Sequence, residues 1–290
     1  HVMRWAVGQL DALVATSDAT GYGVTIGVHS RIDEHTTRVA ARARVGNLYV
    51  NRTLIGATVG VQPFGGEGLS GTGPKAGGPF YLARLDEGRG AHRFTPSTDD
   101  LQWLPAVASQ KRLRAALARC SEWDDAMRAR LDAHCVRCEA AAIGMTTMRL
   151  PGPTGETNTL SLRPRETIAC MANDTIDLVC QIIAAQAVGV VPLARRDALP
   201  PALQSFAKPW DEDIANTDDL QAVLVALPDR DVVRVRQACA ARDGALVTVV
   251  RWGRNTEPVL QLWRLMREFA ESVNTAAAGG NASLMTLNET

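Results

Sequence analysis

The chain has 290 residues, of which 46% are hydrophobic and 21% are charged, and its formal net charge is zero. The hydrophobic content is sufficient to bury the core of one large domain or of two smaller ones. A neutral charge balance argues against nucleic acid or an anionic membrane as a partner, because both require a basic surface. No apolar run approaches the ~18 residues of a membrane span.

The first part of the chain alternates helix-like and strand-like segments. Apolar spacing and turn residues predict helices at 10–20 and 33–43, strands at 24–28 and 48–51, and a short helical or extended segment at 79–85. Between the second strand and the last segment lies a loop dense in glycine. Glycine permits backbone angles and close approaches that a Cβ forbids, so the loop is predicted to bring its backbone close to a ligand.

Residues 95–150 are predicted to be mostly helical. One apolar face recurs at three- and four-residue spacing, and it consists of Trp123, Met127, Leu131, Cys135 and Cys138. The segment 150–156 reads Leu-Pro-Gly-Pro-Thr-Gly-Glu and cannot continue a helix, because its prolines and glycines break it. We therefore place the entrance to a second domain at this segment.

From residue 160 the chain alternates strands and helices, which predicts a parallel sheet with helices on both faces. The expected strands lie at 167–171, 190–193, 222–227 and 245–250, and the expected helices begin at Asn173 or Asp174, at Asp229 and near Glu257. The last of these helices is assigned an inner stripe of Val259, Leu262, Trp263, Met266 and Phe269.

All six cysteines lie in apolar contexts, which is typical of buried, reduced thiols in a cytoplasmic protein. Cys135 and Cys138 have C-x-x-C spacing with His134 beside them, but a zinc site needs a second ligand pair and the sequence offers none. Their position on an apolar helical stripe favours helix packing over a metal or redox role. The sequence therefore predicts no metal site.

The strands of the second part carry no phosphate-binding turn. The residues that follow Met171 are Ala-Asn-Asp, which lack the glycines that let a backbone close on a pyrophosphate. We therefore expect this α/β unit to bind no dinucleotide, and we assign no cofactor-binding residue to the chain.

Three segments resemble the aldehyde dehydrogenase superfamily, and they are Thr20 to Asp33, Val45 to Gly78, and Ser272 to Thr286. Within the superfamily they are most similar to glutamate semialdehyde (1-pyrroline-5-carboxylate) dehydrogenases, in the version fused into the proline utilization A family. The last segment resembles the terminal motif of the long forms of that family. The resemblance spans nearly the whole chain and is weak between residues 95 and 148.

The resemblance implies an organisation of the chain. Residues 1–95 would be the end of an aldehyde dehydrogenase catalytic domain, and residues 96–149 a helical connector. Residues 150–290 would form a small Rossmann-like α/β domain with an open parallel sheet and a terminal motif at 272–286. The fold class expected is therefore α/β.

The resemblance also implies that the chain is the C-terminal fragment of a bifunctional enzyme that oxidises proline to glutamate, with FAD and NAD as cofactors of the parent enzyme. The family's cysteine nucleophile, glutamate and oxyanion-hole asparagine precede the matched segments. We therefore expect no catalytic residue, no bound cofactor and no activity in the fragment alone. The implied partners are the upstream domains of the parent chain, the substrate glutamate semialdehyde and a second copy in a homo-oligomer.

Three residues are assigned to substrate binding by the resemblance. Gly56 and Ala57 match the positions where the family binds the substrate α-carboxylate through backbone N–H groups, and Phe64 matches the aromatic residue that packs on the aliphatic part of the substrate. Backbone donors in a turn suit a carboxylate, because they bind it without ordering a long side chain. Without the resemblance, the glycines would be read as tight turns and Phe64 as a core residue. The role of Lys75, in the same loop, stays open between a surface position and contact with an anionic substrate.

A short internal sequence similarity relates the first and last parts of the chain. Val50-Asn51 leads into Gly56-Ala57, and Val273-Asn274 leads into a run of alanine and glycine. Small residues bury little apolar area but let another backbone approach closely. We therefore expect the segment 272–286 to pack against the aldehyde dehydrogenase portion.

A second hypothesis concerns residues 150–290 alone. An α/β pattern without a phosphate loop or a nucleophile is also typical of a non-catalytic lid or an oligomerisation module. The two hypotheses are compatible, because the first describes the parent enzyme and the second describes this part of it.

Overall fold

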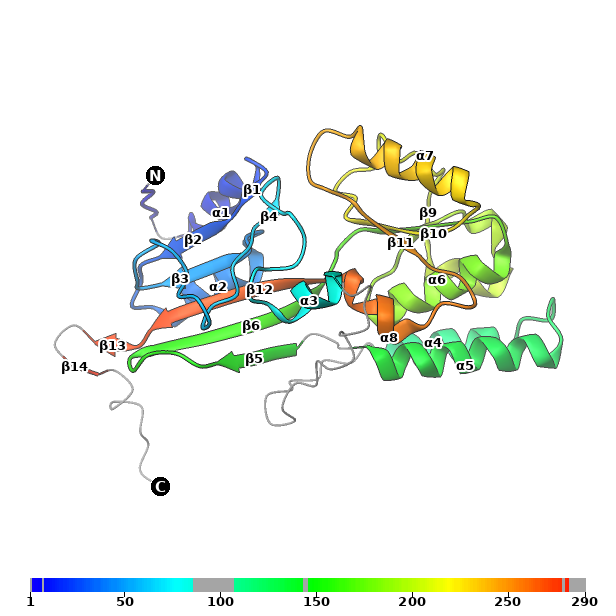
Figure 1. The fold of residues 1–290 in the computed structure, drawn as a ribbon, viewed down its shortest axis with the longest axis horizontal. Helices are drawn as coiled ribbons and strands as arrows, with labels where there is room; N and C mark the ends of the chain where they lie inside the picture. The colour runs from blue at the N-terminus through cyan, green and yellow to red at the C-terminus, as the bar shows by residue number, and fades with distance from the viewer. Residues whose placement is uncertain (1, 7, 86–106, 143–145, 278–279, 282–290) are drawn as a thin grey trace, which may run out of the picture.

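The computed structural model describes residues 2–6, 8–85, 107–142, 146–277 and 280–281. The chain is built around two five-stranded sheets. Two long strands of the first sheet, at 156–164 and 266–274, extend toward the second sheet (Figure 1). None of the helices in these ranges combines the length and the apolar character that crossing a membrane requires.

The first sheet has the order β2-β3-β12-β6-β5. Its strands are β2 (Thr25–Val28), β3 (Asn47–Val50), β12 (Met266–Asn274), β6 (Glu156–Pro164) and β5 (Thr146–Leu150). The first three are parallel to one another, whereas β6 is antiparallel to both of its neighbours, β12 and β5. The sheet therefore contains strands from the beginning, the middle and the end of the chain.

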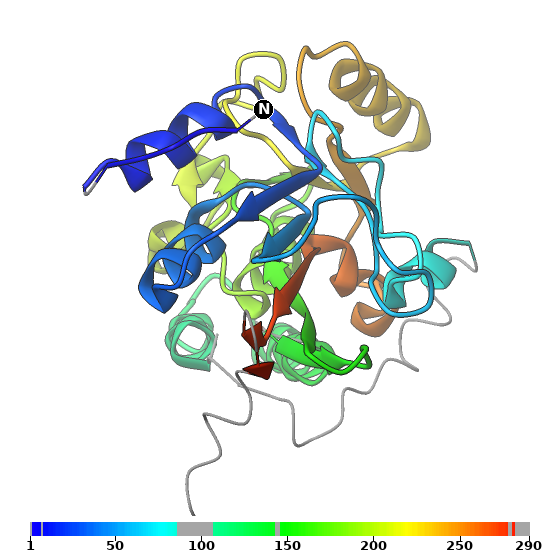
Figure 2. The ribbon, with the colours of Figure 1, turned by 90° about the vertical axis from the view of Figure 1, so that its left-hand side faces the viewer.

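The two faces of the first sheet are covered differently. Helices α1 (Leu10–Asp18) and α2 (Asp33–Arg42) contribute Val14 and Val39 to an apolar cluster with Leu48, Val50 and Phe269 of the sheet. The loop after β3 covers the other face, and Figure 2 shows the helices and this loop on different sides of the strands. Side chains alternate between the faces of a strand, so one face of the sheet is packed by helices and the other by a loop.

The second sheet has the order β11-β10-β7-β8-β9, and every pair in it is parallel. Helix α6 (Thr175–Ala187) packs on one face and α7 (Asp229–Ala240) on the other. Its strands are β7 (Ile168–Ala172), β8 (Leu193–Ala194), β9 (Lys208–Pro209), β10 (Ala222–Ala226) and β11 (Thr248–Arg251). The expected open parallel sheet with helices on both faces is confirmed, and so is the α/β class.

Helices α4 (Val107–Leu117) and α5 (Asp125–Ala141) pack on α6, in agreement with the helical character predicted there. The shorter elements are α3 (Pro79–Leu85), α8 (Pro258–Gln261), three 3₁₀ turns at Arg196–Ala198, Pro201–Phe206 and Leu262–Leu265, and the strand pairs β1 (Tyr22–Gly23) with β4 (Glu67–Gly68) and β13 (Ala276–Ala277) with β14 (Gly280–Asn281).

The predicted boundaries of α6 are confirmed by local chemistry. The Asp174 carboxylate accepts hydrogen bonds from the N–H groups of Ile176 and Asp177, at 2.7 and 3.2 Å, which satisfies two of the free donors at the start of a helix. Gly189 follows the last turn with a φ of 86°, a conformation that favours glycine after a helix.

The helix predicted to begin near Glu257 is wrong in its second half. A helix of one turn, Pro258–Gln261, leads through a 3₁₀ turn into β12 at Met266. The assigned stripe fits helical spacing, but Phe269 faces α1 and α2 while Met266 joins the other core. Pairing with strands on both sides has overridden the local pattern. Strands β5 and β6 were also not predicted.

The two similar segments, at Val50-Asn51 and Val273-Asn274, lie next to each other in space. Val273 pairs with Val50 in the parallel ladder, and Asn274 Nδ2 donates to the Asn51 carbonyl oxygen at 3.1 Å. The expected packing of the terminal segment against the first part of the chain thus holds for its first three residues. Residues 278–279 and 282–286 of that segment lie outside the described residues.

The predicted domain boundaries at 95 and 149 stay a prediction. The pairing of β12 with β3 does show that strands from the proposed last domain continue the sheet of the first. The residues near the first boundary, 86–106, lie outside the described ranges.

Leu162→Ala should lower the free energy of unfolding by about 2–5 kcal/mol, because Leu162 is fully buried in β6 and the smaller side chain would leave a cavity. Urea unfolding of the chain measures this. Leu246→Ala, at a side chain that is 69% exposed, is the matched control and should change the value by less than about 0.5 kcal/mol. Equal effects of the two substitutions would contradict the burial of β6.

Candidate substrate-binding loop

The loop between β3 and α3 carries the three residues assigned to substrate binding. Gly56 is exposed with a φ of 67°, Ala57 is half-buried, and Phe64 is 38% exposed. Among the described residues, the amides of Gly56 and Ala57 have no protein acceptor, whereas the next amide, of Thr58, donates to the side chain of Gln62. Two adjacent backbone donors are therefore free for a ligand.

The second half of the loop is held by a short backbone pair. Phe64 and Ala76 exchange N–H···O bonds of 3.0 and 2.9 Å. This pair closes the loop beside the aromatic ring, and the Gln62–Thr58 bond connects the ring's neighbourhood to the turn at Ala57. The structure thus brings the three assigned residues into one folded loop.

The side chain of Lys75, a residue of the same loop, is buried between the loop and strand β3 and not exposed on the surface. Its residue is only 3% exposed, and Nζ donates to the carbonyl oxygen of Gly65 at 2.6 Å and to Asn47 Oδ1 at 3.2 Å. Gly46 makes room for this contact, because a Cβ there would lie 1.8 Å from the Gly65 oxygen. The lysine is therefore bound to the protein's own backbone, and we assign it no ligand.

A buried carboxyl group accompanies the lysine. Glu268 of β12 accepts the backbone N–H of Lys75 at 2.7 Å. Burial raises the pKa of Glu268 to about 7 and lowers the pKa of Lys75 to about 8, while the attraction between the two charges opposes both shifts. Burial disfavours the charged form of each group, which explains the opposite directions.

Four residues that contact Gln62 or its partners were missed by the sequence interpretation. Arg52, Glu156, Asn158 and Ser272 form a polar cluster on the loop side of the sheet. A signal was present, since Asn158 stands two positions before Leu160 and Ser272 two positions after Ala270, which is strand spacing. Reading the last element as a helix and leaving residues 156–164 unassigned concealed it.

The cysteines offer no nucleophile. All six are buried, and burial raises the pKa of every thiol for which a shift is resolved, to about 12 for Cys135 and Cys180. A thiol held in its neutral form is a poor nucleophile. Within the described chain no group of three metal-binding side chains is positioned to hold an ion, and Cys135 and Cys138 pack in the core as helix residues.

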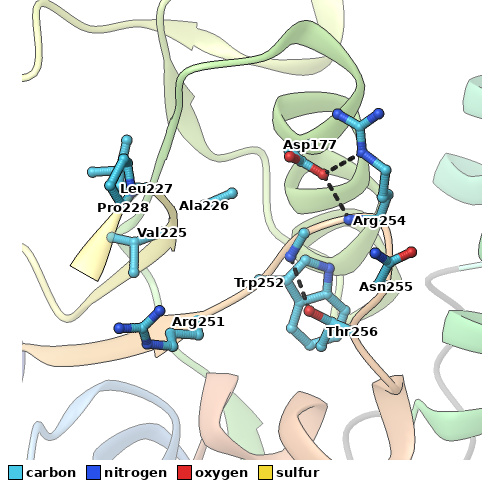
Figure 3. A pocket seen from close by; sticks show the side chains of 11 residues that line it. Asp177, Val225, Ala226, Leu227, Pro228, Arg251, Trp252, Arg254, Asn255 and Thr256 are labelled. Atoms are coloured by element: carbon cyan, nitrogen blue, oxygen red, sulfur yellow. Dashed lines mark hydrogen bonds and ion pairs between the residues drawn. The ribbon is translucent and has the colours of Figure 1, made fainter. Parts of the chain in front are cut away.

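A pocket of about 440 Å³ opens at the carboxyl ends of β10 and β11, near the point where the strand order of the second sheet reverses. Such crevices hold ligands in many open α/β sheets. Figure 3 shows Arg254 reaching to Asp177 at the start of α6, with Arg251 apart from both. Arg254 Nε lies 2.9 Å from Asp177 Oδ1, and Arg254 is also ion-paired with Asp174.

The start of α6 does not fit a dinucleotide. The helix N–H groups that would bind a pyrophosphate are already bonded to the Asp174 carboxylate, and Asp177 adds a second negative charge. A bound phosphate would have to displace both the cap and the Arg254 pairs. This arrangement gives a physical reason for the expectation that the second sheet binds no NAD.

Comparison with known proteins agrees with this architecture. Residues 2–87 match the aldehyde dehydrogenase family. The chain is 45% identical over 297 residues to the bifunctional protein PutA of Escherichia coli, covering 99% of this chain and 22% of that protein. It is 38% identical over 301 residues to bifunctional protein PutA of Rhizobium meliloti, covering 99% and 23%.

Two further similarities bear on the parts of the chain. A 1-pyrroline-5-carboxylate dehydrogenase of Bacillus thuringiensis is 49% identical over 73 residues, which cover 25% of this chain and 14% of that enzyme. The structure of proline utilization A from Corynebacterium freiburgense superposes with a TM-score of 0.62 at 21% identity, covering 93% of this chain and 25% of that one. The latter similarity shows the fold alone.

The chain is therefore similar to the aldehyde dehydrogenase family in residues 2–87 and, over nearly its whole length, to the C-terminal part of PutA proteins. It spans about a fifth of the length of those curated relatives.

Glu268→Gln should make the stability of the chain less dependent on pH between about 4.5 and 7. The folded-state pKa of Glu268 is raised, so its stabilising contribution is complete below about 4.5 and is lost as the pH rises through about 7. The variant keeps the acceptor for Lys75 but never ionises, so its melting temperature should rise relative to wild type as the pH increases from 5 to 8.

Thermal unfolding across this range measures the effect, with Glu34→Gln at an exposed carboxylate of α2 as the control. A wild-type advantage at pH 8 would show that the buried carboxylate is stabilised by its surroundings and would contradict the raised pKa.

Proposed function

We propose that the chain is the C-terminal part of a bifunctional enzyme that oxidises proline to glutamate, and that it supplies the carboxylate-binding loop of the glutamate semialdehyde dehydrogenase site. The observation that supports this most directly is the turn at Gly56 and Ala57, which has two adjacent free amides and lies in the same loop as the partly exposed ring of Phe64. The similarity to PutA proteins and to 1-pyrroline-5-carboxylate dehydrogenases supports a substrate of this class.

In this proposal the chain's residues bind and orient the substrate. The Gly56 and Ala57 amides donate to the carboxylate, in a turn that needs no long side chain to become ordered. Phe64 packs on the aliphatic carbons between the carboxylate and the aldehyde. Together they fix the distance from the anchor to the reacting carbon, which shortens the search for a reactive geometry.

The nucleophile and both cofactors belong to upstream domains in this proposal. NAD, when bound there, supplies the hydride acceptor for the aldehyde, and FAD supplies the oxidant for proline. The buried, neutral state of the six thiols supports an external nucleophile, and the capped start of α6 supports an external NAD site. Cytoplasmic location and a homo-oligomer remain parts of the proposal.

Residues 150–290 take a structural role within the same enzyme. Strands β6 and β12 extend the sheet that carries the loop, so this region supports the substrate site without chemistry of its own. This reading combines the catalytic hypothesis for the parent enzyme with the non-catalytic hypothesis for its last part.

Assay of glutamate-semialdehyde-dependent NADH formation tests the assignment. The 290-residue chain alone should show no turnover, and the longer enzyme that contains it should be active. Isothermal titration of the chain with NAD should give no binding in the micromolar range. Turnover or micromolar NAD binding by the chain alone would contradict the division of roles.

In the longer enzyme, Ala57→Leu should raise the KM for glutamate semialdehyde about tenfold or more, because a branched side chain would crowd the two amides and remove charge-assisted hydrogen bonds of roughly 1.5–3 kcal/mol each. The KM for NAD should stay the same. Val59→Leu, at a 97% exposed position of the same loop, is the control. An unchanged semialdehyde KM in the Ala57 variant would remove the anchor assignment.

A further inference from the structure

Gln62 occupies an unusual position for an amide in a surface loop. Its residue is only 7% exposed, and both ends of the amide are bonded to protein. Oε1 accepts the Thr58 N–H at 3.1 Å. Nε2 lies 2.7 Å from Glu156 Oε1, 3.0 Å from Asn158 Oδ1 and 3.1 Å from Ser272 Oγ.

Chemistry dictates which way this amide faces. The Glu156 carboxylate only accepts hydrogen bonds and the Thr58 amide only donates them, so the Gln62 nitrogen must face the sheet and the oxygen must face the loop. A buried polar group that loses its partners is costly. The network therefore holds the Gln62 side chain, and with it the Thr58 backbone, in one orientation.

The partners on the sheet form one row across three strands. Ser272 of β12 pairs with Tyr49 of β3 on one side and with Asn158 of β6 on the other. Arg52 closes the row, because its guanidinium lies 4.5 Å from the centre of the Tyr49 ring and donates to Ser272 Oγ at 2.7 Å and to Glu156 at 3.1 Å.

The position of Gln62 in the loop relates this row to the substrate site. Its bond to Thr58 fixes the residue that follows the Gly56–Ala57 turn, and Phe64 follows Gln62 by two positions. Beyond Phe64 the backbone is held again, by Lys75 Nζ on the Gly65 carbonyl. The turn and the ring thus lie on a loop with two internal attachments to the sheet.

We propose that Gln62 is a positioning residue that sets the geometry of the carboxylate-binding turn, and so makes the site selective for aldehydes that carry a carboxylate. This inference rests on the proposed function. Gln62 does not contact the substrate; it acts through the Thr58 backbone. Its own position is fixed by hydrogen bonds to Asn158 of β6 and Ser272 of β12.

The test compares two substrates in the full-length enzyme, glutamate semialdehyde and the uncharged aldehyde butanal. Gln62→Leu should lower kcat/KM for the semialdehyde at least tenfold, mainly through KM, and should leave kcat/KM for butanal within about twofold. A role in general folding would lower both values together, so the ratio of the two separates positioning from stability.

Two further variants complete the design. Gln204→Leu makes the same substitution at a half-buried glutamine near α6, with one bond of 3.3 Å to a backbone oxygen, and it should leave the ratio unchanged. Ser272→Ala removes one partner of Gln62 and should shift the ratio in the same direction by a smaller factor, and it carries the test if Gln62→Leu does not fold.

The outcomes are distinguishable. An equal loss for both substrates, or no change in the ratio in either variant, overturns the positioning role. A wild-type enzyme that prefers butanal, or that fails to oxidise the semialdehyde, overturns the proposed function instead.

Discussion

Backbone pairing between β3 and β12 joins stretches of the chain that are far apart in sequence, since the paired residues Val50 and Val273 are 223 positions apart. Everything described at the loop depends on this parallel pairing. It places Ser272 beside Tyr49 and Glu268 beneath Lys75, and it brings β6 within reach of the loop through its own pairing with β12. The last part of the chain is therefore a structural component of the first.

The two faces of the first sheet are held to their neighbours by different interactions. The face under α1 and α2 carries an apolar cluster, so it contributes stability through burial and close packing. The opposite face carries apolar residues such as Leu160 and Leu162, and among them a buried polar group in which a carboxyl group, a lysine, two amides and a hydroxyl are bonded to one another or to the loop backbone. Such networks contribute little net stability but specify one geometry. A loop rich in glycine needs that specification, because its backbone has many accessible conformations.

Much of the architecture followed from local patterns. The parallel sheet near α6 and α7, the Asp174 cap and the elements from Leu10 to Val50 all have strong periodicity or turn chemistry, and the structure confirms them. The helix prediction for residues 257–274 was wrong in its second half. Their spacing is compatible with a helix, but it was overridden by pairing with strands that lie outside any local sequence window. The position of Lys75 could not be predicted for the same reason: its burial depends on Gly46 and Glu268, which lie far from it in the sequence. Sequence resemblance located the loop, whereas the residues of β6 and β12 that hold the loop on the sheet were identified only from the structure.

The separation between the paired strands has a consequence for biosynthesis. At 5–20 residues per second, a ribosome needs roughly 10–45 seconds to advance from β3 to the end of β12. During this time β2 can pair with β3, but the opposite edge of β3 has no partner from the nascent chain. Open strand edges pair readily with other chains. The segment from β2 to β3 is therefore translated long before its sheet can be completed, and one edge of β3 stays open to pairing with other chains during that time.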